Sequence, residues 1–262
     1  MAKIWARPIL EITIALMALM SVSSIAPFTQ IVQKTISAQV FQSMIAQSVS
    51  ATVSSLMLPL ILMCAILTSL SFARDYEQGM MQSTLSLPVS RKLYFITKFA
   101  AVILPLTLLA WFFTTFFVII TFYSNALLAL QLSFFALPVS FLFLMFCGSL
   151  GVLIALTIKR TIPTVLATML TNFFLWFTAS VNTSYALSVG GDFANYLALN
   201  PYKTSLIFLN KLLNFKEMTA SQTGTFESTL PVEFYGILAI VYAFILTIPI
   251  FIYFYRRFEI CE

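Results

Sequence analysis

The stretch that decides the fold is FAAVILPLTLLAWFFTTFFVIITF, residues 99–122. It contains no charged side chain, and it is longer than the about 20 apolar residues that a helix needs to cross a bilayer. Five further runs share this apolar character, at residues 8–26, 52–73, 132–157, 161–182 and 232–255. The sequence therefore predicts an all-α, polytopic membrane protein with six transmembrane helices.

The composition supports a single membrane domain. The 262 residues are 60% hydrophobic and 9% charged, whereas soluble domains carry about 25% charged residues. A chain with so few charges cannot build a water-facing surface, so we expect a multi-pass protein of the cell membrane, surrounded by membrane lipids, with one domain over residues 1–262. Residues 1–26 have the layout of a signal peptide, and we interpret them as the first transmembrane helix.

Positive charges indicate the orientation. If the N-terminus is cytoplasmic, ten of the 14 basic residues lie in inner segments: Lys3, Arg7, Arg74, Arg91, Lys92, Lys98, Lys159, Arg160, Arg256 and Arg257. The outer segments then hold only Lys34, Lys203, Lys211 and Lys216. Cytoplasmic loops carry an excess of Lys and Arg, so both termini are predicted to be cytoplasmic. The same distribution explains the net charge of +5 without a nucleic-acid partner.

Several function classes are disfavoured by what the chain lacks. It has no histidine, the commonest general base and metal ligand, and no Walker A nucleotide-binding pattern. No charged residue lies in the middle of a predicted span, where ion-coupled carriers need one. We expect no catalytic residue, no metal and no cofactor in this chain, so energy for uphill transport would come from another subunit.

The inner segment between the second and third spans is the best candidate for contact with such a subunit. Residues 75–87 have an amphipathic rhythm that predicts a short helix, which Pro88 would stop. Ser90 is a plausible N-cap for the helix that carries Lys98 into the third span. An ordinary loop with solvated charges is the alternative interpretation of this segment.

The outer segment before the last span has its own helix signal. Asn200-Pro201 combines an N-cap residue with a proline for the first turn, and the apolar residues after it could enter the membrane interface. Asn182-Thr183-Ser184 matches a glycosylation sequon, which leaves modification of Asn182 open. Residues 27–50 fit either a surface helix or an extension of the second span.

Polar and small residues within the spans offer few sites. Thr171 and Asn172 are the candidates for a transport path or an interhelical hydrogen bond. Gly148 and Gly151 would let helices approach closely in the fourth span. The many phenylalanines fit lipid-facing and packing surface better than a conduit for apolar cargo.

The inner segment resembles the coupling helix of the permeases of ABC type-2 transporters. The resemblance rests on Glu77, Gly79, Leu85, Leu87, Pro88, Val89, Ser90, Arg91 and Lys98, together with the six-span layout. It implies that an ATP-binding subunit docks on this segment, with these docking residues: Asp75, Glu77, Gly79, Leu85, Leu87, Pro88 and Arg91.

The resemblance also implies a dimeric permease, formed with a second copy or a homologous permease, that works as an exporter, the family's usual mode. Separate cytoplasmic ATP-binding subunits would bind ATP and Mg²⁺ and drive it. Spans one and five commonly face the partner permease in that family, and re-entrant helices precede the last span on the outer side. A non-transporting membrane scaffold or assembly subunit is the alternative, and a secondary transporter is a third hypothesis.

Overall fold

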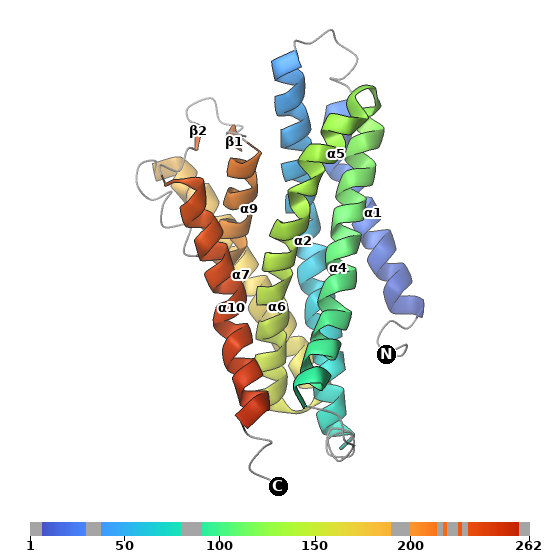
Figure 1. The fold of residues 1–262 in the computed structure, drawn as a ribbon, viewed down its shortest axis with the longest axis vertical. Helices are drawn as coiled ribbons and strands as arrows, with labels where there is room; N and C mark the ends of the chain where they lie inside the picture. The colour runs from blue at the N-terminus through green and yellow to red at the C-terminus, as the bar shows by residue number, and fades with distance from the viewer. Residues whose placement is uncertain are drawn as a thin grey trace.

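The computed structural model describes residues 7–29, 38–79, 91–189, 200–213, 217–218, 225–226 and 230–256. These residues form a bundle of helices that stand side by side (Figure 1). The helices are α1 (Arg7–Thr29), α2 (Ala38–Glu77), α4 (Arg91–Thr121), α5 (Ala126–Phe134), α6 (Ala136–Ile158), α7 (Thr161–Val189), α9 (Pro201–Leu212) and α10 (Val232–Arg256), with a 3-10 turn η1 (Tyr123–Asn125). Strands β1 (Glu217–Met218) and β2 (Thr225–Phe226) form a minimal antiparallel pair.

The prediction of six helices long and apolar enough to cross a membrane is confirmed. Within the described residues, six helical stretches have the length and apolarity of membrane spans: Leu10–Thr29, Val40–Glu77, Leu93–Thr121, Tyr123–Ile158, Thr161–Ala179 and Val232–Phe254. Lipid offers no partner to backbone N–H and C=O groups, so these runs pair them internally as helices. The chain has the architecture of a multi-pass membrane protein, in which α1 begins and α10 ends at the same end of the bundle (Figure 1).

Several helices extend beyond the apolar runs, and two of these extensions add whole segments to a span. The polar residues before the second span extend it, because α2 is one helix of 40 residues. Its length is about 60 Å, whereas the hydrocarbon core of a bilayer is about 30 Å thick. Helix α2 therefore projects beyond the core. The fourth span also starts earlier than residue 132, because α5 leads into α6 through Phe135 alone.

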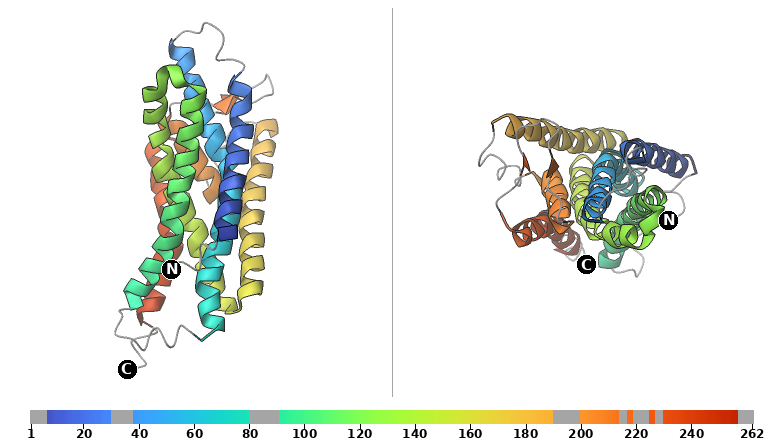
Figure 2. Two further views of the ribbon diagram at one scale, coloured as in Figure 1. Left: turned by 90° about the vertical axis from the view of Figure 1, so that its right-hand side faces the viewer. Right: turned by 90° about the horizontal axis from the view of Figure 1, so that it is seen from above.

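Helix α2 is the centre of the bundle. It packs against α1, α4, α6 and α7, and the view from above shows these helices around it (Figure 2). In its most apolar stretch 78% of the residues are buried, against 22% in α7 and in α10. Helices α7 and α10 therefore lie at the periphery, where much of their apolar surface is left to face lipid.

Two glycines on α6 allow close helix contacts, as the sequence predicts. A Cβ atom at position 148 would lie 2.7 Å from the Ile103 Cδ1 atom of α4. A Cβ atom at position 151 would overlap the Thr68 hydroxyl of α2 and lie 3.2 Å from the Thr168 methyl of α7. The Thr68 side chain is buried and its hydroxyl donates to the Cys64 carbonyl, so it has little room to move.

We therefore predict that Gly151→Ala destabilises the bundle by about 1–3 kcal/mol, the usual cost of overpacking a filled core. The measurement is thermal unfolding of the purified chain in mild detergent. Gly236→Ala is the control, because its Cβ atom would meet only the ring edge of Phe208, at 3.0 Å. Equal melting temperatures for Gly151→Ala and the wild type would contradict the close-packing account.

Candidate functional site

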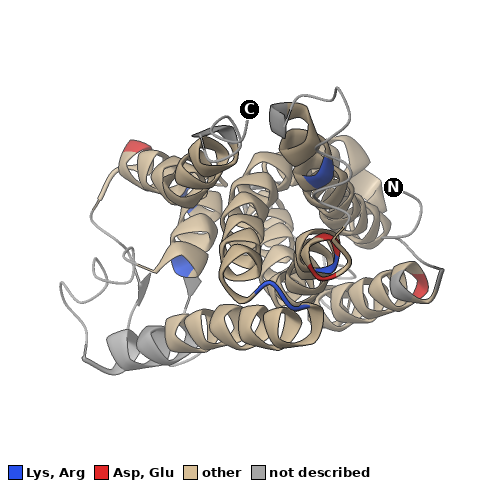
Figure 3. Cartoon of the chain, turned by 90° about the horizontal axis from the view of Figure 1, so that it is seen from below, with Lys and Arg blue, Asp and Glu red and all other residues tan. Residues whose placement is uncertain are grey.

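Charged side chains gather at the end of the bundle where α1 begins and α10 ends, which we call the basic end. Seen from this end, acidic and basic residues lie close together over the end of α2 and the turn between α6 and α7 (Figure 3). The predicted docking segment leaves α2 and enters α4 here. A soluble subunit that contacts this segment would therefore approach the basic end.

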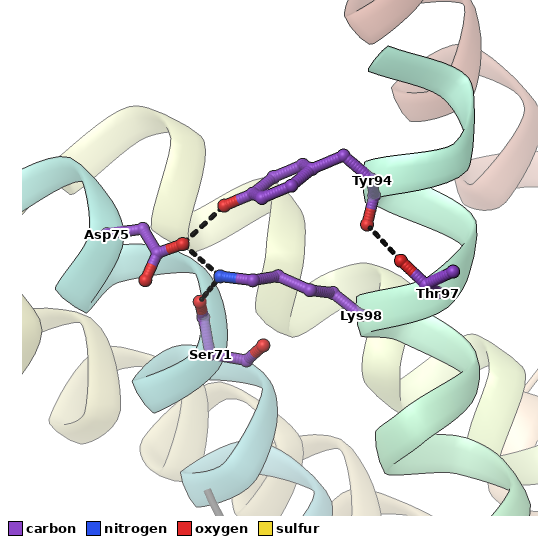
Figure 4. A network of polar contacts seen from close by, with 5 residues as sticks. All are labelled: Ser71, Asp75, Tyr94, Thr97 and Lys98. Carbon is purple, nitrogen blue, oxygen red and sulfur yellow. Dashed lines mark hydrogen bonds and ion pairs between the residues drawn. The ribbon is translucent and has the colours of Figure 1, made fainter. Parts of the chain in front are cut away.

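A charged contact joins α2 to α4 at this end (Figure 4). The Lys98 ammonium pairs with the Asp75 carboxylate and donates to the Ser71 carbonyl at 2.9 Å. The Tyr94 hydroxyl donates to the same Asp75 oxygen, and its ring lies 4.8 Å from the Lys98 ammonium. The side chains of Lys98 and Asp75 are only 17% and 14% exposed, so this contact is largely shielded from solvent.

Helical periodicity brings the side chains of this contact together. Ser71 and Asp75 lie one turn apart on α2, and Tyr94 and Lys98 lie one turn apart on α4, so each pair shares a face. Polar groups near the ends of the spans meet a partner instead of lipid. The contact joins the two helices that flank the segment between α2 and α4.

Glu77 links the same end of α2 to α7. Its carboxylate accepts from the Thr161 backbone N–H at 3.0 Å and from the Thr161 hydroxyl. Thr161 is the first residue of α7, where N–H groups lack intrahelical partners and negative charge is favoured. Lys159 makes the tight turn before it in the left-handed conformation, with φ of 58°. Glu77 therefore acts as the cap of another helix.

The predicted short helix does not begin at Asp75. Residues up to Glu77 continue α2, and Gly79 follows it with φ of +64°, a conformation that ends helices and favours glycine. Its N–H donates to the Tyr76 carbonyl. The amphipathic rhythm of residues 75–87 thus includes the last turn of a span. Leu85, Leu87 and Pro88 lie outside the described residues, and Arg91 is the first residue of α4.

A second polar cluster lies in the middle of the bundle. The Asn172 amide of α7 donates to the Thr168 carbonyl at 2.9 Å and accepts from the Tyr202 hydroxyl of α9 at 2.5 Å. The Cys147 thiol of α6 lies 3.7 Å from the same hydroxyl. Asn172 is fully buried, and its bond with Tyr202 joins α7 to α9. Thr171 faces outward and donates only to the Ala167 carbonyl of its own helix.

The helix α9 that supplies Tyr202 starts as the sequence predicts. The Asn200 side chain accepts from the Tyr202 N–H at 3.0 Å, and Pro201 occupies the first position. Its apolar residues do more than touch the interface, because Leu206, Leu209 and Leu213 belong to the main core. Ser50 of α2 donates to Asn210 near its other end, so α9 is held inside the bundle.

Lys203 is the residue that sequence reasoning missed. It follows Tyr202, whose hydroxyl contacts Cys147 near the midpoint of α6, and it is only 7% exposed. The Asn200-Pro201 pair predicted the helix, but it did not indicate how deep in the bundle the helix starts. Among the described residues, no group of three or more His, Cys, Asp or Glu side chains could hold a metal ion.

The contact between Asp75 and Lys98 should be measurable as a coupling. We predict that Asp75→Asn and Lys98→Met each lower stability, and that the double variant loses about 1–3 kcal/mol less than the two losses together. Thermal unfolding in detergent measures all three variants. Glu233→Gln, at the exposed start of α10, should change stability by less than about 0.5 kcal/mol. Strict additivity of the two single changes would show that the contact contributes nothing.

The buried cluster gives a parallel prediction. Asn172→Leu and Tyr202→Phe should show a coupling of about 1 kcal/mol, as for hydrogen bonds between membrane helices. The matched control is Thr171→Ala, one residue away on the outward face, which should leave the melting temperature near that of the wild type. If Tyr202→Phe is as destabilising in the Asn172→Leu background as alone, the hydrogen bond is not a stabilising one.

Comparison with known proteins gives no protein-family model, no curated protein and no solved structure that matches the chain.

Proposed function

We propose that this chain is the membrane-spanning permease subunit of an ATP-binding-cassette exporter, and that it works as a dimer driven by separate ATP-binding subunits. One observation carries the proposal: the ends of the two helices that flank the segment resembling a coupling helix are tied to each other and to a third span. Asp75 ties the end of α2 to Lys98 of α4, and Glu77 ties it to the start of α7.

These contacts support a mechanism in which a force on the segment changes the positions of the spans relative to one another. The segment leaves α2 at Gly79 and reaches α4 at Arg91, twelve residues later in the chain. A soluble subunit that displaces it would move the ends of α2 and α4 together, because Asp75 and Lys98 hold them in one contact. Glu77 would pass the displacement to α7, whose Asn172 contacts α9 in the middle of the bundle.

The resemblance implies a dimer through α1 and α7, and both helices carry exposed apolar surface that a second permease could cover. The most apolar stretches of α1 and α7 are only 28% and 22% buried. Both helices pack against α2, and they lie along one side of the bundle when it is seen from below (Figure 3). A second permease seated on that side would bring two copies of Thr171, which faces outward, near the interface between the subunits.

One observation favours a second candidate, a secondary transporter. Lys203 brings a titratable group into the interior of the bundle, and intramembrane ionisable residues mark ion and proton pathways. Transport driven by a proton or sodium gradient in proteoliposomes without ATP, lost in Lys203→Met, would favour this candidate over the exporter.

The docking proposal is tested by purification of the tagged chain from membranes in mild detergent. We expect a soluble ATP-binding protein to copurify with the wild type. An acidic residue in an apolar docking surface leaves an unpaired charge, so Leu87→Asp should lower the amount recovered by about tenfold, the effect of 1.4 kcal/mol. The matched control is Tyr123→Asp, at a 79% exposed position at the opposite end of the bundle.

If the same amount of ATP-binding protein is recovered with Leu87→Asp as with the wild type, this segment is not the docking site. Absence of any ATP-binding protein, with the chain still folded, would contradict the exporter and favour a scaffold or assembly subunit. Glu77→Ala is a poor docking variant by itself, because it also removes the cap of α7.

A further inference from the structure

An apolar groove of about 360 Å³ runs between α4 and α10, with α6 as its back wall. Figure 1 shows α6 between these two helices. The groove floor is buried, with Phe99 and Ile103 at 6% and 1% exposure. Its rims are open, with Ile96 of α4 and Ile248 of α10 at 49% and 53% exposure. It is therefore a furrow in the lipid-facing surface.

The depth of the groove matches one leaflet. Its lining on α4 runs from Phe95 to Leu104, which corresponds to about 14 Å of helix. One leaflet contributes about 15 Å to the hydrocarbon core. Phe95 lies in the first turns of α4, so the groove starts near the basic end and stops near the middle of the membrane.

The lining of the groove fits an acyl chain better than a helix. Helices that pack in membranes use small residues at the contact, whereas most of the lining here is isoleucine, leucine and phenylalanine, with only Ala100 and Thr247 as small residues. The Phe95 and Phe99 rings stack at 5.5 Å and give the floor a flat aromatic surface.

Charge indicates which lipid would be held. Lipid tails are as apolar as the groove, so burial of a chain gives no preference for one headgroup. Basic residues mark the helix ends at the mouth: α4 begins with Arg91 and Lys92, and α10 ends at Arg256. Such positions attract anionic headgroups.

We propose that this groove is a binding site for one acyl chain of an anionic phospholipid from the leaflet at the basic end. The chain lies along Phe95 and Phe99, and the phosphate headgroup lies at the level of Arg91 and Lys92. This lipid site requires only that the chain lies in a membrane. It does not depend on the proposed ATPase partner.

Native mass spectrometry of the full chain, purified with an equal mixture of phosphatidylglycerol and phosphatidylcholine of identical acyl chains, tests the site. The wild type should retain one phosphatidylglycerol in preference to phosphatidylcholine by about tenfold, since two basic residues near the membrane surface supply such an attraction. Ala100→Trp should fill the groove and remove the retained lipid. Leu108→Trp, on the same helix at an exposed position outside the groove, should retain it.

The paired change Arg91→Gln and Lys92→Gln should abolish the preference between the two lipids. Equal retention of phosphatidylglycerol by Ala100→Trp and the wild type would overturn the site, as would equal retention of the two lipids by the wild type. If Ala100→Trp does not fold, as judged by its melting curve, Ile248→Trp fills the groove from the opposite wall and is held to the same outcomes.

Discussion

Lipid cannot pair with backbone N–H and C=O groups, and the rest of this structure depends on that constraint. It requires the apolar runs to be helices and leaves side chains to decide how those helices meet. Helix α2 takes the central position, where 78% of its most apolar stretch is buried. Small or hydroxyl-bearing residues such as Gly151 and Thr68 then set how closely its neighbours approach.

Polar contacts collect at two levels, and each has a different consequence. At the basic end, Asp75 and Glu77 bind α2 to α4 and α7, which makes the end of α2 a junction of three spans. In the middle of the bundle, Asn172 and Tyr202 bind α7 to the short helix α9. A displacement at the first level would reach the second through α7, and this connection is the physical core of the proposed transporter mechanism.

Local patterns predicted the spans and the start of α9 at Asn200-Pro201, because each depends on residues near one another in sequence. A buried amide within an apolar run indicated a hydrogen bond from Asn172, but not its partner Tyr202, 30 residues away on another helix. They did not predict that α2 continues through Asp75, since an amphipathic rhythm does not mark where a helix ends. They also could not pair Glu77 with Thr161, 84 residues away, or place Lys203 in the interior. Those features arise from packing between segments that are distant in the sequence. No local pattern of residues indicates such contacts.

The most direct test of the central claim is site-specific photo-crosslinking in native membranes, with a photoreactive amino acid at position 87. The account predicts one dominant adduct, between this chain and a soluble ATP-binding protein, which disappears when peripheral proteins are stripped from the membrane before irradiation. An adduct with a protein that binds no nucleotide, or with lipid alone, would contradict it.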